Sequence, residues 1–124
     1  MLRNTKQREE IRRVLRRAGR PLSPQEVLDT ARPALPRLGI ATVYRNLRAL
    51  VEAQWLRAVE LPGAPDRYEV AGKAHHHHFH CRSCDGLFEI EDCPGNLAAL
   101  TPQDYYLERH EIFLYGLCDA CGPP

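Results

Sequence analysis

The sequence has no long apolar run. No stretch of its 124 residues is apolar over a length that could span a bilayer, and the segment Met1–Arg8 is charged and has no apolar signal-peptide core. We therefore expect a cytoplasmic protein with no membrane partner, in which the five cysteines stay reduced. The 44% content of hydrophobic residues suffices for one ordinary domain or two small ones, but not for one large core.

Motifs of common enzyme classes are also absent. The sequence contains no His-Glu-x-x-His pattern for a catalytic zinc and no nucleophile elbow. A zinc hydrolase would need an open metal position beside a general base, and a dithiol oxidoreductase would need a thioredoxin-like strand and helix around its cysteines. The sequence shows neither context, so we expect a protein that is not an enzyme.

Charge is divided unevenly along the chain. Residues 1–72 contain 14 Lys and Arg against 8 Asp and Glu, a net charge of +6, whereas residues 73–124 contain 3 against 8, a net charge of −5. A basic half suits the phosphate backbone of nucleic acid, and an acidic half rich in His and Cys suits cations. The alternative is that the arginines only solvate helix faces.

Two Cys-x-x-Cys pairs, Cys81 with Cys84 and Cys118 with Cys121, are separated by 33 residues. A two-residue spacer lets each pair bind one ion through a tight turn, and a structural zinc takes four thiolates in tetrahedral geometry. The two pairs therefore predict one structural Zn²⁺ per chain. Disulfides and a redox dithiol are the alternatives. Disulfides are disfavoured because the cysteines are expected to stay reduced, and a redox dithiol is disfavoured because neither pair follows a thioredoxin-like strand and helix pattern.

The first half carries the pattern of three amphipathic helices. Apolar residues recur at helical spacing over residues 6–18, and Gly19 ends this helix. A capping box over Ser23–Glu26, with proline at the first helical position, predicts a second helix from about 24 to 32. A third apolar stripe predicts a helix over residues 40–52.

The third predicted helix has a polar and cationic outward face. Two helices joined by a short turn, with such a face on the second, place a recognition helix in the DNA major groove. Two β-prone runs, Trp55–Leu61 and Arg67–Val70, then predict a winged hairpin. Tyr44 is alternatively a half-buried helix residue. The residues that we expect to contact DNA are Thr42, Tyr44, Arg45 and Arg48, with Arg16 of the first helix on a phosphate.

A run of histidines precedes the first cysteine pair. Successive side chains of an extended segment alternate sides, so the odd-numbered and even-numbered histidines face opposite ways. One run can therefore supply ligands to two metal sites. His80 is expected to be a strand surface residue. Imidazole with carboxylate suits zinc, iron, nickel or copper and does not choose among them. The two candidate ligand sets are His75, His77 and His110, and Glu69, His76, His78 and Glu89.

Three separated motifs occur in an order that resembles the ferric uptake regulator (Fur) family of metal-dependent bacterial transcription factors. They are Ala41–Arg45, His75–Cys84 and His110–Cys118. The resemblance covers nearly the whole chain. It implies an α+β protein with a winged helix-turn-helix DNA-binding domain over residues 1–72, a hinge near residues 70–74, and a small α/β metal-binding dimerisation domain with a structural zinc site over residues 73–124.

The resemblance also gives each ligand set a role. Pro21 departs from the family pattern, because iron- and peroxide-sensing branches usually supply a histidine two residues before the position of Ser23. Asn96 departs from it as well, because the family normally supplies a glutamate there to the odd-numbered histidines. By resemblance, the structural zinc ligands are Cys81, Cys84, Cys118 and Cys121, the regulatory ligands at the domain junction are Glu69, His76, His78 and Glu89, and an additional site contains His75, His77 and His110.

The second half is most similar to the zinc uptake regulator (Zur) branch, in which an extra cysteine, here Cys93, precedes a proline. Cys93 is then either a soft ligand or a small buried residue. The cysteine that zinc-type junction sites often include near residues 69–71 is missing, and a ligand role for Asp66 is left open. The resemblance therefore implies a homodimeric, zinc-dependent regulator of metal homeostasis that represses by binding palindromic double-stranded operator DNA. The dimer is expected to come from strands near residues 87–90 and 105–117 and from a short helix near residues 95–101. The alternatives are a regulator that senses iron (Fe²⁺) or manganese (Mn²⁺), and a DNA-binding protein in which zinc is structural and no metal is sensed.

Overall fold

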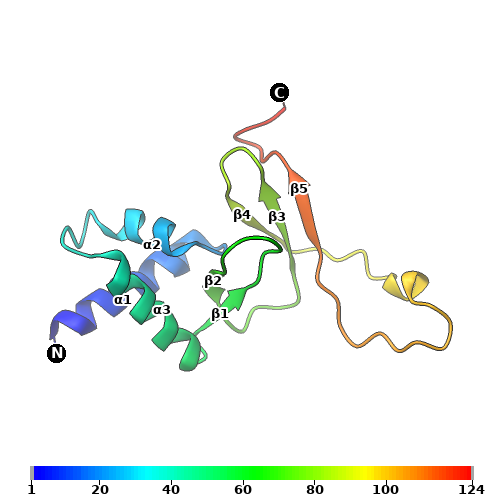
Figure 1. Ribbon diagram of the computed structural model, residues 1–124, viewed down its shortest axis with the longest axis horizontal. Helices are drawn as coiled ribbons and strands as arrows, with labels where there is room; N and C mark the ends of the chain where they lie inside the picture. Colours follow the sequence, from blue (N-terminus) through cyan, green and yellow to red (C-terminus); the bar gives the residue numbers. More distant parts are fainter. Residues whose placement is uncertain (1, 124) are drawn as a thin grey trace. The chain divides into compact units, whose positions relative to one another are not determined.

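The computed structural model describes residues 2–123 of an α+β protein (Figure 1). The chain divides into two compact units, of which the first ends at Lys73 and the second begins at Ala74. Each unit has its own sheet, of two strands in the first and three in the second. Among the described residues, no helix has the length and apolar content needed to cross a bilayer.

Three helices and a hairpin form the first unit (Figure 1). The helices are α1 (Leu2–Ala18), α2 (Pro24–Ala31) and α3 (Ile40–Glu52), so α1 begins four residues earlier than its apolar pattern indicates. The apolar stripes of all three helices meet in one core, as the helical spacing predicts. The buried residues of this core are Ile11, Val14, Leu15, Leu22, Val27, Leu28, Ala31, Leu38, Val43, Leu47, Leu50 and Leu56.

The predicted winged hairpin is present as two short antiparallel strands, β1 (Leu56–Val59) and β2 (Arg67–Val70). Leu22, in the turn between α1 and α2, adds a backbone bridge to Tyr68 of β2, with both N–H···O distances at 2.9 Å. This bridge fixes the hairpin against the helices that precede it. The first unit is therefore a winged helix-turn-helix.

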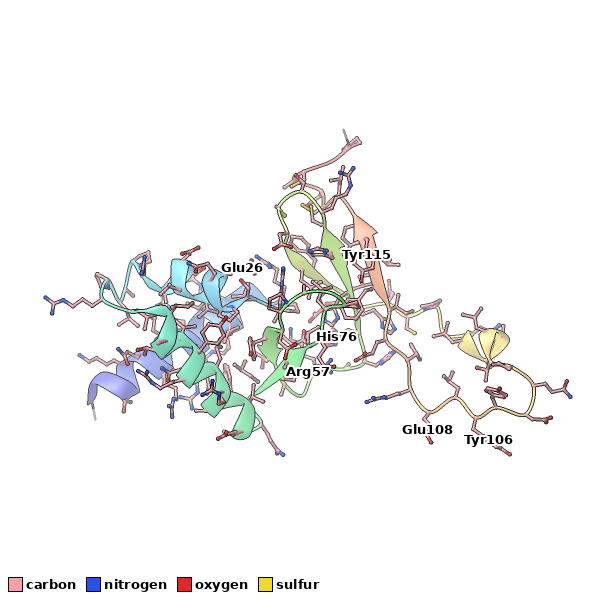
Figure 2. All side chains as sticks on the ribbon, viewed as in Figure 1. Glu26, Arg57, His76, Tyr106, Glu108 and Tyr115 are labelled. Atoms are coloured by element: carbon pink, nitrogen blue, oxygen red, sulfur yellow. The ribbon has the colours of Figure 1, made fainter. Side chains whose placement is uncertain are left out.

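The second unit is built on the sheet order β4–β3–β5. Strand β3 (His77–Cys81) lies in the centre, antiparallel to β4 (Leu87–Ile90) and parallel to β5 (Phe113–Gly116). Between β4 and β5 the chain runs away from the sheet through a single 3₁₀ turn, η1 (Leu97–Leu100), and returns as an open loop (Figure 1). Tyr106 and Glu108 lie on this loop (Figure 2).

One predicted strand is much shorter than expected. The sequence predicts a strand near residues 105–117, but only Phe113–Gly116 has strand structure. The reason is the length of its neighbour, because β3 offers backbone partners only from His78 to Cys81. The Ile112 carbonyl still accepts from the His78 N–H at 3.1 Å, but residues 105–112 have no strand structure. The helix predicted near 95–101 is present only as the turn η1.

The capping box of α2 provides a test of the first unit. Glu26 N–H donates to Ser23 Oγ at 3.1 Å, and Ser23 N–H donates to Glu26 Oε1 at 2.9 Å. Because Ser23→Ala leaves one of these N–H groups without its acceptor, we expect the free energy of unfolding to fall by about 1 kcal/mol, measured by urea denaturation. Ser23→Thr retains the hydroxyl and should lose less, so equal losses in both variants would contradict the capping role.

Candidate metal centres and nucleic-acid interface

The four cysteines of the two Cys-x-x-Cys pairs come together at one end of the second unit. Cys81 ends β3, Cys84 lies in the turn to β4, and Cys118 and Cys121 follow β5. Their sulfur atoms all lie within 4.8 Å of one another, and Cys84 Sγ is 3.9 Å from Cys118 Sγ. Tetrahedral zinc–sulfur bonds of about 2.3 Å separate thiolates by about 3.8 Å, so the arrangement fits one zinc ion.

Electrostatics within the cysteine cluster also favour a bound cation. The backbone N–H groups of Cys84 and Cys118 lower the pKa of the buried Cys81 thiol. Contact with the Cys118 thiol raises the pKa of Cys121, because a second anion beside the first is unfavourable. Four thiolates therefore need a cation between them, which is what a structural zinc supplies.

The histidine run alternates as its extended pattern predicts. The ring centroids of His75 and His77 lie 4.5 Å apart, and those of His76 and His78 lie 4.9 Å apart. The two pairs belong to separate clusters of candidate ligands. One short segment thus contributes side chains to two clusters of candidate ligands.

The odd-numbered histidines meet His110 from the segment before β5. His75 Nε2 lies 3.0 Å from His110 Nε2, and the rings of His77 and His110 are 4.9 Å apart. Cys93, from the loop after β4, places its Sγ 3.2 Å from His110 Nε2. Burial, followed by the neighbouring histidines, lowers the pKa of His77 and favours the neutral ring that binds metal.

The even-numbered histidines lie beside Glu89 of β4. The backbone of His78 pairs with that of Glu89, and His76 Nε2 is 3.7 Å from Glu89 Oε1. The remaining candidate ligand of this set, Glu69, lies on β2 of the first unit, where its carboxylate accepts from Arg57 Nε at 3.1 Å. The assignment of Glu69 to a regulatory site stays a prediction.

Two further polar residues, His80 and Asn96, are near the candidate ligands in the sequence, and of these His80 lies outside the candidate clusters of His, Cys, Asp and Glu side chains among the described residues. His80 is half-buried, and its Nε2 contacts Oδ1 of the exposed Asp85 at 2.6 Å. Asn96 is exposed and occupies the position just before η1. Neither residue therefore gives a reason to extend the ligand sets.

The outward face of α3 presents the cationic and polar residues that the sequence assigns to DNA. Tyr44, Arg45 and Arg48 are exposed, and Tyr44 retains 44% of its accessible surface, which favours a contact role over the half-buried alternative. Arg45 donates to Thr42 Oγ1 at 2.9 Å, so the two side chains are held together on one turn. This is the donor pattern that reads base edges in a major groove.

Sequence reasoning missed the contacts that orient the first helix. Arg8 Nε donates to the buried Asn46 Oδ1 at 2.9 Å and ties α1 to α3. The Arg16 guanidinium lies 5.6 Å from the centroid of the Trp55 ring and 3.4 Å from Glu9 Oε1, so Arg16 is already engaged within the unit. A polar Asn46 within the apolar stripe of α3 was the one sequence signal for the first contact.

Comparisons with known proteins agree with this architecture. The model of the ferric uptake regulator family matches residues 1–115. The ferric uptake regulation protein of Campylobacter jejuni is 34% identical over 126 residues, covering 98% of this chain and 80% of that protein. The structure of the Helicobacter pylori ferric uptake regulator, described as having three functional metal binding sites, is 31% identical with a TM-score of 0.69, covering 98% and 85% of the two chains. FurB of M. tuberculosis, a zinc uptake regulator, is 27% identical with a TM-score of 0.55, covering 98% and 96%.

Proposed function

Because the chain belongs to the ferric uptake regulator family of metal-responsive transcription regulators, which are not enzymes, we propose that it is a zinc-dependent repressor that binds palindromic operators as a homodimer. In this proposal residues 1–72 bind DNA, and residues 73–124 bind metal and form the dimer. The observation that carries it is the pairing of an exposed cationic helix face in one unit with separate clusters of metal-binding side chains in the other.

Support for a dimer comes from apolar side chains that the second unit leaves exposed. Solvated apolar surface of this extent is typical of a surface that binds another protein. Several of these residues lie on the open loop before β5, and others lie on β5 itself, including Tyr115 (Figure 2). The exposed residues are Leu100, Tyr105, Tyr106, Leu107, Leu114 and Tyr115.

Support for zinc comes from ligand chemistry and from similarity. The thiol of Cys93 beside His110 adds a soft donor to the additional site, which suits zinc better than manganese, while the imidazole and carboxylate ligands of the regulatory set accept several metals. The similarity to FurB, a zinc uptake regulator, points the same way. Iron or manganese sensing is the second candidate, and the 34% identity to a ferric uptake regulation protein favours it.

The regulatory site in this proposal consists of His76, His78 and Glu89, joined by Glu69. A metal held by ligands from both halves of the chain would fix the DNA-binding unit in one orientation, so that the two copies in a dimer match the spacing of the operator half-sites. The arrangement of His76, His78 and Glu89 within the second unit supports this role. The site with His75, His77 and His110 would support the response rather than switch it.

The function can be tested by letting the protein select its own operator. Zinc-loaded protein selects duplexes from a random library, and fluorescence anisotropy then measures its affinity for a selected duplex against buffered free Zn²⁺, Fe²⁺ and Mn²⁺. We expect selected sequences to be palindromic and affinity to rise with zinc. Equal affinity with and without metal in the regulatory site would identify a DNA-binding protein that does not sense metal. A response to iron or manganese alone would refute the proposal that zinc is the sensed metal.

Arg45 provides a test of the recognition helix. Because its guanidinium lies on the exposed face of α3, Arg45→Ala should lose ~1 to 3 kcal/mol of binding to the selected duplex, and should lose most of its discrimination at one base position. The measurement is anisotropy on the selected duplex and on single-base variants. Unchanged binding by a protein with native circular dichroism would refute a base contact by Arg45.

Arg16→Ala is the comparison variant, since its position on α1 suits a phosphate contact. Its loss should be uniform across sequences, and the slope of log affinity against log salt should decrease by about one unit. Because Arg16 also stacks on Trp55, urea unfolding must first show that the first unit stays folded. A loss confined to one base position would instead assign Arg16 to base reading.

A further inference from the structure

The segments around the odd-numbered histidines meet at one end of the sheet in the second unit. Strand β4 runs antiparallel to β3 and so ends where β3 begins, as the pairing of His77 with Ile90 shows. Strand β5 runs parallel to β3 and so begins at the same end, with Phe113 beside His78. The topology therefore brings the residues before β3, after β4 and before β5 together, and each of these segments supplies at least one metal-binding side chain.

The loop after β4 contributes a sulfur atom to this meeting point. Cys93 Sγ lies 3.2 Å from His110 Nε2, which itself lies 3.0 Å from His75 Nε2. One donor atom from each of His75, His77, Cys93 and His110 lies within 4.8 Å of the others. Tetrahedral zinc with bonds of about 2.0 to 2.3 Å separates its ligand atoms by about 3.3 to 3.6 Å, so small side-chain movements suffice to admit an ion.

His77 gives independent evidence that this cluster binds a ligand. Its side chain is buried, with 2% of the residue's surface exposed, and Nε2 has no hydrogen-bond partner among the described residues. The Ile112 N–H donates to Nδ1 at 3.2 Å, which leaves the ring proton on the unpaired Nε2. A buried donor without an acceptor is unfavourable. Coordination gives Nε2 a partner. The ring proton then moves to Nδ1, and the Ile112 N–H must leave Nδ1 as the ion binds.

Asn96 is a poor candidate for the fourth donor. It stands at the position where the family resemblance implies a glutamate, but it is exposed, and zinc sites in proteins use thiolate, imidazole and carboxylate ligands rather than neutral amides. Cys93 lies three residues earlier in the chain and already contacts His110. Exchange of a carboxylate for a thiolate keeps the charge of the ligand set and replaces a hard donor by a soft one.

We infer that Cys93 is the fourth ligand of a closed His₃Cys site, and that this site takes Zn²⁺ or Co²⁺ in preference to Mn²⁺ or Fe²⁺. Three imidazoles and one thiolate match the tetrahedral preference of zinc and leave no open position for catalysis. The inference builds on the additional site proposed above, but not on its role in operator binding. With the four-cysteine site filled, Cys93 is the one remaining thiol of the five in the chain.

Cobalt titration tests the site directly. Full-length protein that retains zinc in its four-cysteine site should take up Co²⁺ with the visible bands of a tetrahedral ion and a sulfur-to-cobalt charge-transfer band. Cys93→Ser should lose the charge-transfer band and bind this equivalent at least about tenfold more weakly. Asn96→Ala is the matched control and should retain both the band and the affinity.

Two outcomes of the cobalt titration would overturn the inference. Persistence of the sulfur band in Cys93→Ser would place the cobalt among the other cysteines. Absence of the band in the unmodified protein, together with weaker cobalt binding by Asn96→Ala, would assign the fourth position to Asn96. Alkylation of the unmodified protein by iodoacetamide gives a readout that needs no variant: zinc beyond the first equivalent should protect Cys93, as measured by peptide mass spectrometry. Absence of protection would also refute the site. None of these readouts uses DNA, so failure here leaves the proposed regulatory function to its own test.

Discussion

Cys84→Ser or Cys118→Ser should lose about one equivalent of tightly bound zinc per chain, together with the dimer. The reason is that the second unit has a small three-stranded sheet, and four thiolates around one ion would contribute much of its stability. We expect the free energy of unfolding of this unit to fall by more than about 4 kcal/mol, a loss typical of removing a structural metal. Metal analysis by mass spectrometry and sedimentation velocity measure the two effects.

Cys93→Ser is the matched control for this prediction, because Cys93 lies outside the four-cysteine cluster. It should retain the structural zinc and the dimer. Arg8 and Asn46 connect helices of the first unit only, so the α-helical circular dichroism of the Cys84 and Cys118 variants should largely persist. Retention of both zinc and dimer by the two variants would refute the structural site.

Replacement of His76 and His78 by alanine should abolish the metal-dependent gain in operator affinity and leave the cysteine-bound zinc and the dimer intact. Both residues project to the side of the histidine run opposite His75 and His77, and His76 lies beside Glu89. A coupling free energy of ~1 to 3 kcal/mol corresponds to a gain of ~5 to 150-fold, which the double variant should lose. Anisotropy against buffered free zinc measures it.

The odd-numbered pair supplies the comparison. Alanine at His75 and His77 should blunt the response or move its zinc threshold without eliminating it. Thermodynamic linkage adds a second check. Operator DNA must raise the affinity of the protein for the regulatory metal by the same factor by which that metal raises its affinity for DNA. A full zinc response in the even-numbered double variant would show that the switch lies on the other side of the strand.

The first unit illustrates how much local sequence pattern can determine. The stripe containing Val43 and Leu47, the capping box of Ser23 with Glu26, and the β-prone run Arg67–Val70 each predict an element that the structure contains. These signals are local, because helix spacing and capping depend on residues three or four positions apart. Exposure of Arg45 on α3 follows from the same spacing, since burial of one stripe turns the opposite face outward.

The second unit illustrates where local pattern fails. The length of β5 depends on the backbone that β3 offers to it, and the run Tyr105–Ile112 contains no sign of that limit. The partner of Arg8 lies 38 residues away on α3, and the stacking of Arg16 on Trp55 likewise joins separate elements. Long-range pairs of this kind are set by packing of whole elements rather than by neighbours in the chain.

The sequence by itself determined the chemistry of this protein: two cysteine pairs with zinc spacing, a histidine run that alternates sides, and a basic half followed by an acidic half. Residue type and short-range periodicity suffice for these, because ligand identity and strand alternation are properties of the chain. Only the tertiary structure decided which residue of the loop after β4 lies beside His110, namely Cys93. That choice depends on how the loop after β4 returns to the start of β5, and the direction of a loop is fixed by the strands on either side of it.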